Sequence, residues 1–190
     1  MGLIGKMVRQ TNVKFDGDVF HKIFTHRPHQ MSTISPDNVK AVNLQEGGWG
    51  STGSIIVVNF VHDGKQKVAE EIIEAVDEEK QSVTYKVIGG DLMELYKTFR
   101  ITVHVDTKGE DNLVTWTFEY EKLNAGTEDP DTLMDFCLNV TKDIETHHIL
   151  QQKYSHTLLF KFSLFNSSGP LSRSTSSEPK TPMLAFGVDG

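Results

Sequence analysis

Three glycines in the segment EGGWGSTGS form the most suggestive chemical motif of the chain. Gly48, Gly50 and Gly53 have the G-x-G-x-x-G spacing with which dinucleotide-binding enzymes bring a backbone close to phosphates. That motif must open a helix, because the helix N-terminus supplies the N–H groups that hold the anion. Here the β-branched run Ile-Ile-Val-Val follows, which favours a strand. We therefore predict a structural hairpin and no nucleotide cofactor.

Acid–base chemistry has four candidate side chains. Tyr85, Tyr96, Glu70 and Lys97 are residue types that donate or accept protons in enzymes. Each of them is equally compatible with a strand or loop position that faces solvent. The sequence therefore assigns no catalytic residue, and catalysis stays an alternative.

A metal site would have to come from the histidines. His21, His26 and His29 are separated by five and three residues, and Pro28 interrupts them. This spacing matches no ordinary zinc pattern, in which ligands recur at short fixed intervals on one turn or helix face. His147 and His148 are adjacent and so point to different faces of a helix. We predict no metal.

Short segments rich in Val, Ile, Thr and aromatic residues must position any site. Most alternate with a period of two and are separated by Gly, Asn and Asp, as strands joined by turns are. Residues 68–76 are also read as a strand, although their glutamates would suit a helix. The predicted strands are residues 39–44, 54–61, 68–76, 83–88, 99–105 and 113–120.

Two segments have helical spacing instead. Within residues 11–25, Asp16 can cap a helix and Phe20, Ile23 and Phe24 repeat at intervals of three and four. A longer helix begins near Asp129-Pro130-Asp131, with proline in its first turn, and is predicted to run to about residue 150. The order of elements predicts an α+β fold with an antiparallel sheet.

Composition limits the possible partners. The chain has 190 residues and a formal net charge of -7, which suits one globular domain. An acidic protein has no electrostatic hold on nucleic acid or anionic membranes, and the apolar runs are too short to span a bilayer. Cys137 is the single cysteine, so no intramolecular disulfide forms. We expect a cytoplasmic monomer.

Several segments resemble a known family. They are MGLIGKMVRQ, EGGWGSTGS, HDGK, VIGGDLMELYKTF, WTFEYEKLN and DPDTLMDFCLNVTKDIETHH. Together they are similar to the plant major latex proteins, a branch of the Bet v I and pathogenesis-related class-10 superfamily. The resemblance covers residues 1 to about 150. It implies the helix-grip fold, in which a seven-stranded antiparallel sheet curves around a long C-terminal helix, with two short helices after the first strand.

The resemblance also implies a function. Relatives take up steroids, hormones, flavonoids, fatty acids or alkaloid-like molecules in a hydrophobic cavity between sheet and helix. This indicates a ligand carrier in plant defence and stress response, with a possible ligand-dependent protein partner. The alternative is an enzyme that converts such a ligand in the same cavity by alkaloid condensation or isomerisation.

The cavity wall can be assigned from strand alternation and the helical stripe. Periodicity alone would favour a solid core, because protein interiors are normally close-packed, whereas the resemblance favours a hollow one. Tyr85 would place an orienting hydroxyl among apolar walls. The predicted ligand-binding residues are Ile23, Met31, Val39, Val58, Phe60, Val83, Tyr85, Val87, Phe99, Ile101, Val103, Trp116, Phe118, Leu133, Phe136 and Val140.

The last part of the chain differs from the rest. Residues 1–152 are predicted to form the domain, and residues 153–190 an atypical, disordered extension. Residues 166–182 are dense in Ser, Pro and Thr without periodicity, which is typical of disorder. The segment TLLFKFSLF is read as a short strand or a partner-binding patch.

Overall fold

The computed structural model describes residues 3–108 and 111–167. The chain divides into two compact units, Met1–Lys153 and Tyr154–Gly190. The helices and strands, in chain order, are β1 (Ile4–Val13), α1 (Gly17–Thr25), η1 (Pro28–Gln30), α2 (Met31–Ile34), β2 (Val39–Glu46), β3 (Ile55–His62), β4 (Lys65–Asp77), β5 (Ser82–Gly90), η2 (Asp91–Glu94), β6 (Tyr96–Lys108), β7 (Asp111–Lys122) and α3 (Asp131–Ser167).

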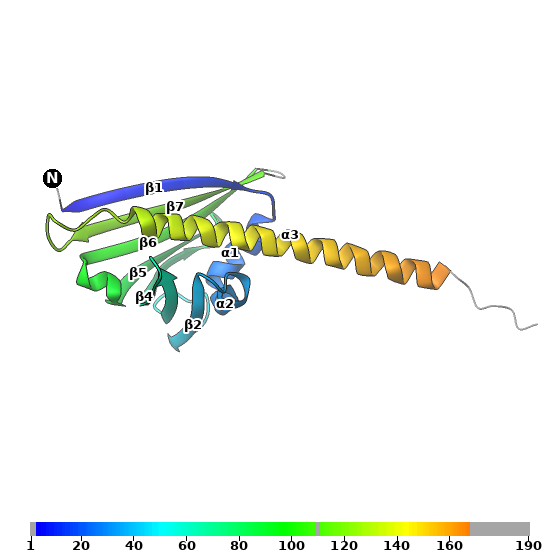
Figure 1. The fold of residues 1–190 in the computed structure, drawn as a ribbon, viewed down its shortest axis with the longest axis horizontal. Coiled ribbons are helices and arrows are strands. Elements are labelled where there is room, and N and C mark those ends of the chain that lie inside the picture. The colour runs from blue at the N-terminus through cyan, green and yellow to red at the C-terminus, as the bar shows by residue number, and fades with distance from the viewer. Residues whose placement is uncertain (1–2, 109–110, 168–190) are drawn as a thin grey trace, which may run out of the picture. The chain divides into compact units, whose positions relative to one another are not determined.

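The strands form one antiparallel sheet of seven, in the order β1-β7-β6-β5-β4-β3-β2. The helices α1 and α2 carry the chain from β1 at one edge to β2 at the other. Within the first unit, α3 crosses one face of the sheet (Figure 1). This confirms the predicted α+β fold, including the two short helices after the first strand.

The strand β7 shows how alternation sets the two faces of the sheet. Val114, Trp116 and Phe118 are buried, whereas Thr115 and Thr117 between them are half-buried on the opposite face. The same period of two places apolar residues of the other central strands on this inner face. The core therefore lies between the inner face of the sheet and α3.

The two predicted helices also form. The Asp16 carboxylate caps α1 by accepting a hydrogen bond of 2.8 Å from the backbone N–H of Asp18. On α3, the predicted apolar stripe is buried at Leu133, Val140 and Ile144. The helix thus covers the sheet with the face that the sequence indicates.

The predicted end of α3 is wrong. The helix does not end at about residue 150 but continues to Ser167. Neither glycine nor proline occurs between Asp131 and Ser167, so nothing in the chain interrupts the backbone hydrogen bonds. Residues 153–167 are therefore helical, which differs from the disorder expected there, and TLLFKFSLF is helical and not a strand. The other interpretation of this segment, a partner-binding patch, stays a prediction. The rest of that extension, residues 168–190, lies outside the described residues.

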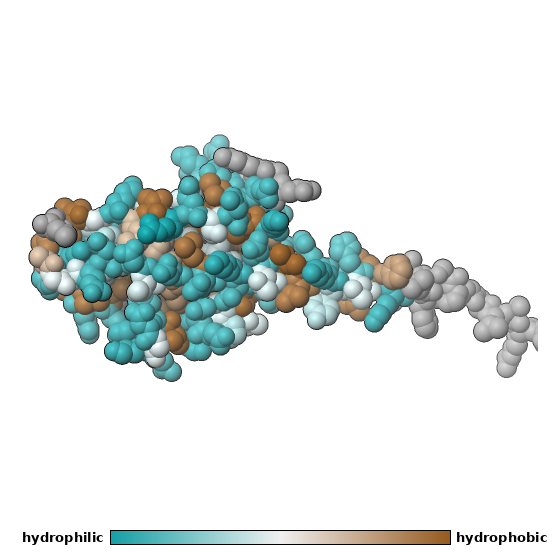
Figure 2. Space-filling model, turned by 45° about the horizontal axis from the view of Figure 1, so that its top comes forward, coloured by the Kyte–Doolittle hydropathy of each residue, from teal (hydrophilic) through white to brown (hydrophobic). Residues whose placement is uncertain are grey.

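The face of the molecule drawn in Figure 2 is mainly hydrophilic. In Figure 2 the hydrophobic residues on the visible face of the first unit are dispersed among hydrophilic ones. Exposed large apolar side chains occur in both units, at positions such as Ile4 and Leu95 in the first and at Tyr154, Leu158, Leu159 and Phe160 in the second. Over residues 3–108 and 111–167, none of the helices combines the length and the apolar character needed to cross a membrane.

The glycine-rich segment is a connection between strands. It joins β2 to β3, and the Ser54 side chain closes it by accepting from the Gly48 N–H at 2.9 Å and donating to the Gly48 carbonyl at 2.8 Å. Gly50 has a φ of 73°, a conformation that favours glycine. A hairpin, rather than a loop that opens a helix, is therefore confirmed.

Replacing Gly50 with alanine should lower the free energy of unfolding by about 1–2 kcal/mol, because a Cβ is strained at positive φ. The added Cβ would also lie 3.2 Å from the His26 ring. Gly48→Ala is the matched control, since its Cβ would have only an ordinary contact of 3.5 Å with Ser51. Urea unfolding of the two variants measures the difference. Equal stabilities would contradict a structural role for Gly50.

Candidate functional site

A cavity of about 90 Å³ lies between the inner face of the sheet and α3. Ligand sites for drug-sized molecules usually measure roughly 300–1,000 Å³. The cavity therefore admits only a small molecule as it stands, and a larger ligand requires wall side chains to move. Its lining residues are Phe24, Pro28, Met31, Val39, Val42, Ile56, Val58, Glu71, Tyr85, Ile101, Trp116, Phe136, Cys137 and Val140.

The structure brings only part of the predicted ligand-binding set to this wall. The predicted residues that line the cavity are Met31, Val39, Val58, Tyr85, Ile101, Trp116, Phe136 and Val140. The others are buried in the core but do not line this cavity, and they are Ile23, Phe60, Val83, Val87, Phe99, Val103, Phe118 and Leu133.

Aromatic packing explains why part of the inner face is solid. The Phe99 ring lies 5.1 Å from Phe118, 4.9 Å from Tyr96 and 5.9 Å from Tyr120, measured between centroids. Rings in such contacts fill the space between strands and helix. The cavity lies outside this aromatic cluster, and its wall is drawn from α1, η1, α2, the strands β2 to β7 and α3.

Two of the polar groups on the cavity wall already have partners in the protein. The Trp116 indole N–H donates to Thr141 Oγ1 at 3.0 Å, which ties β7 to α3. The Tyr85 hydroxyl donates to the Phe24 carbonyl. Burial, followed by the charge of Glu71, raises the pKa of Tyr85 well above its usual range. Tyr85 is thus a neutral wall residue whose proton is already engaged, and the orienting role predicted for it remains a prediction.

Glu71 is the polar wall residue that the sequence interpretation missed. It lies in β4 between Ala69 and Ile73, faces inward with them, and is 8% exposed. Its neighbour Glu70 points the other way and accepts a hydrogen bond of 3.1 Å from Gln45. Alternation along β4 could have identified Glu71, because it shares the parity of the two apolar residues.

The environment of Glu71 shifts its protonation equilibrium toward the neutral form. Burial raises the pKa of this carboxyl to about 7, because an ionised carboxylate loses its hydration in an apolar cavity. Cys137 lines the same cavity, and burial, followed by the charge of Glu71, raises the pKa of its thiol. At neutral pH the thiol is therefore not the thiolate that nucleophilic chemistry requires.

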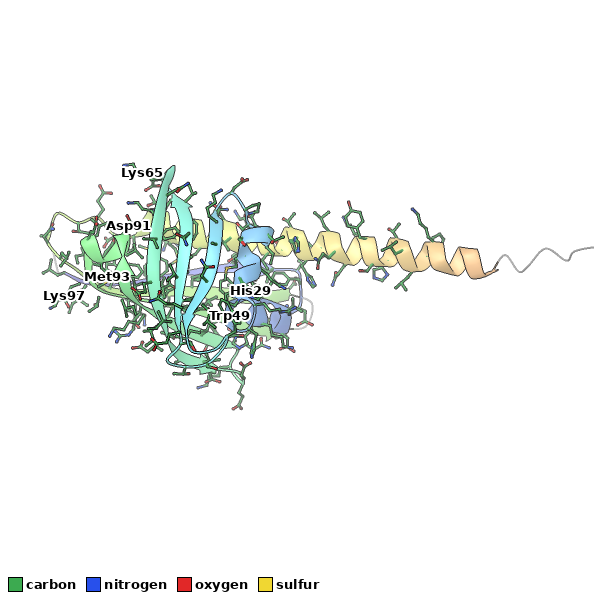
Figure 3. All side chains as sticks on the ribbon, turned by 90° about the horizontal axis from the view of Figure 1, so that it is seen from below. His29, Trp49, Lys65, Asp91, Met93 and Lys97 are labelled. Carbon is green, nitrogen blue, oxygen red and sulfur yellow. The ribbon has the colours of Figure 1, made fainter. Side chains whose placement is uncertain are left out.

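The other candidate acids and bases do not reach the cavity. Lys97 is exposed and pairs with Glu121 at 3.0 Å, at the end of the sheet away from Trp49 (Figure 3). The Tyr96 hydroxyl donates to the Glu128 carbonyl at 3.0 Å. Of the four candidates, only Tyr85 belongs to the wall.

The three N-terminal histidines have different environments. His21 is buried, with its Nε2 3.1 Å from Glu78. His26 lies 2.7 Å from the Thr25 hydroxyl. The His29 ring packs against Trp49 of the hairpin, with centroids 5.2 Å apart (Figure 3). In the described part of the chain, no cluster of three or more His, Cys, Asp or Glu residues could hold a metal.

A surface pocket of about 260 Å³ lies beside the cavity, between the end of β3 and α3. Phe136 belongs to the walls of both the cavity and this pocket. Its ring is 5.4 Å from the Phe60 ring and 6.5 Å from the His62 ring, between centroids. Most of the other residues that line the surface pocket are polar, Asn38 and Asp135 among them.

Comparisons with known proteins agree with this architecture. The model of the pathogenesis-related protein Bet v 1 family matches residues 2–152. The crystal structure of ginseng major latex-like protein 151 from Panax ginseng is similar, with a TM-score of 0.76 and 52% sequence identity. That match covers 77% of this chain and 99% of the ginseng chain.

Curated sequences from Arabidopsis thaliana are also similar. MLP-like protein 43 is 41% identical over 152 residues, which is 79% of this chain and 96% of the relative. MLP-like protein 28 is 42% identical over 153 residues, or 80% of this chain and 46% of the relative. The chain thus spans nearly all of the first relative and about half the length of the second.

Proposed function

The chain belongs to the pathogenesis-related protein Bet v 1 family, and we propose that it binds and carries small hydrophobic ligands. The observation that carries this proposal is the cavity between the sheet and α3, whose wall is apolar apart from a few polar groups. Such a composition is typical of sites that take up apolar molecules. The proposed setting is the cytoplasm, in plant defence and stress response.

Carriage without chemical conversion fits the cavity better than catalysis. Acid–base catalysis on a bound molecule normally needs groups whose protons are free to move toward it. The Tyr85 proton is engaged by a backbone carbonyl, and the Cys137 thiol stays protonated at neutral pH. Among the lining residues this leaves Glu71 alone as a group that can exchange a proton near neutrality.

Replacing Val140 with tryptophan should strongly weaken ligand binding. Val140 is 3% exposed and lines the cavity, so an indole at this position would occupy the space that a ligand needs. Overpacking typically lowers stability by about 1–3 kcal/mol. We expect the affinity for the neutral apolar dye N-phenyl-1-naphthylamine to fall at least about tenfold, a loss of some 1.4 kcal/mol. Fluorescence titration measures it.

Val87→Ala is the matched control for this experiment. Val87 is 1% exposed but lies outside the cavity wall, so its truncation should lower stability by a similar amount without changing dye affinity. Unchanged dye binding in a folded Val140→Trp protein would place the binding site elsewhere. Unfolding of that variant at ambient temperature would instead indicate a core with no usable space.

A further inference from the structure

The only acidic side chain on the cavity wall lacks a partner. No hydrogen bond or ion pair to the Glu71 carboxylate occurs within residues 3–108 and 111–167. Other glutamates of the same strand are partnered: Glu70 accepts from Gln45 at 3.1 Å, and Glu74 pairs with Arg100 at 2.7 Å. A buried carboxyl without a partner is energetically unfavourable, so its presence calls for an explanation.

No other residue of the wall supplies a free strong hydrogen-bond donor or a positive charge to this carboxyl. The two strong donors that line the cavity, the Tyr85 hydroxyl and the Trp116 indole N–H, already donate to Phe24 and Thr141. No lysine, arginine or histidine is among the lining residues. The cavity therefore presents one acceptor that can carry a negative charge, surrounded by apolar side chains.

A bound molecule could supply what the wall does not. A protonated nitrogen would donate a hydrogen bond to the Glu71 carboxylate and neutralise its charge, and such charge-assisted bonds are stronger than neutral ones. A ligand carboxylate would meet a like charge and find no cation in the wall. The net charge of -7 also attracts cations and repels anions before they reach the cavity.

We propose that the cavity selects apolar molecules that carry one protonated nitrogen, with Glu71 as the counter-ion. This inference rests on the proposed ligand-binding function and narrows its ligand class. It sets aside fatty acids and other apolar anions as ligands of this cavity. Glu71 acts in it as a binding residue and not as a catalyst.

Three probes with the same aromatic ring separate charge from apolar contact. They are 2-naphthylmethylamine, 2-naphthylmethanol and 2-naphthoate, which are cationic, neutral and anionic at pH 7.5. Isothermal titration of the full chain should show the amine binding at least about tenfold more tightly than the alcohol, and the naphthoate most weakly. Glu71→Gln should remove the preference for the amine and leave the affinity for the alcohol within about threefold.

Glu70→Gln is the matched control, because Glu70 is the next residue of β4 and points to the outer face. This variant should keep the preference for the amine.

A second measurement needs no variant. Lowering the pH from 8 to 5.5 should weaken amine binding to the wild-type chain, because Glu71 becomes protonated while the amine stays charged.

The affinity for the alcohol should stay the same when the pH is lowered from 8 to 5.5. Tyr85 on β5 and Cys137 on α3 are the other ionisable groups that line the cavity, and their raised pKa values keep both neutral over this range.

The outcomes distinguish this inference from the function on which it rests. Equal affinities for amine and alcohol, or a preference that survives in Glu71→Gln, would overturn the role of Glu71 and leave the carrier function standing. Tighter binding of the naphthoate would also overturn it. If neither the three probes nor the neutral dye binds, both the inference and the proposed function are contradicted.

Discussion

Glu71→Gln should make the protein more stable relative to wild type as the pH rises from 5 to 8. Burial raises the pKa of Glu71 from 4.5 to about 7 in the folded chain. The stability associated with the protonated carboxyl is therefore fully present below pH 4.5 and is lost as the pH rises through 7. A glutamine has no such loss, because it does not ionise.

The expected size of this effect is about 2–3 kcal/mol, since one pKa unit corresponds to about 1.4 kcal/mol. Urea unfolding of both proteins at pH 5 and pH 8 measures the change in their stability difference. Any penalty for burying the glutamine amide is the same at both pH values and cancels in this comparison. A difference that does not change with pH would show that Glu71 is hydrated or paired in solution.

Glu74→Gln provides a control of opposite sign. Its carboxylate lies on the outer face of β4, and the hydrogen bond from Arg100 lowers its pKa below the usual value. Wild-type stability from this pair is present above the unfolded pKa and is lost as the pH falls through the folded one. Glu74→Gln should therefore be slightly destabilised near neutral pH and approach wild type in acid.

Phe99→Ala should cause the largest loss of stability, about 3–5 kcal/mol, which corresponds to a fall in Tm of roughly 6–20 °C for a domain of this size. The Phe99 side chain is 0% exposed, and its ring contacts three other aromatic rings. Its removal leaves a void in the solid part of the core. Differential scanning calorimetry measures the change in Tm.

The same variant also tests how far the hollow region extends. Phe99 lies outside the cavity wall, so the folded Phe99→Ala protein should bind the neutral dye with wild-type affinity. Phe136→Ala is the contrasting variant, because Phe136 is half-buried and lines the cavity. Phe136→Ala should lower stability less than Phe99→Ala does, and it should change the affinity for the dye. A changed dye affinity in Phe99→Ala would show that the two regions of the core communicate.

Most of the fold could be predicted from the sequence because its signals are local. Alternation in β7 and the cap at Asp16 depend on residues only a few positions apart, and the structure confirms both. The long helix was recognised from its apolar stripe, but its C-terminal end was not. After Ile144 the apolar stripe weakens, so burial no longer determines where the helix ends. Its length beyond this residue follows from the absence of Gly and Pro.

The site was predicted less completely, and the reason is physical. Alternation indicates which face of the sheet a side chain occupies, but not whether the space opposite is filled. Phe99 and Ile101 share the inner face of β6, yet only Ile101 lines the cavity. Glu71 was missed because a run of glutamates usually indicates a solvated face, and here one of them points inward.

The position of Phe136 has a consequence for the speed of ligand exchange. Its ring is shared by the inner cavity and the outer pocket, so a molecule that passed directly between them would displace this side chain. Rotation of a side chain is a local, rapid motion, whereas separating α3 from the sheet would break the Trp116–Thr141 hydrogen bond and expose the core. A substitution at residue 136 should therefore alter the residence time of a ligand more than it alters the stability of the fold, so uptake and release can be fast in a protein that rarely unfolds.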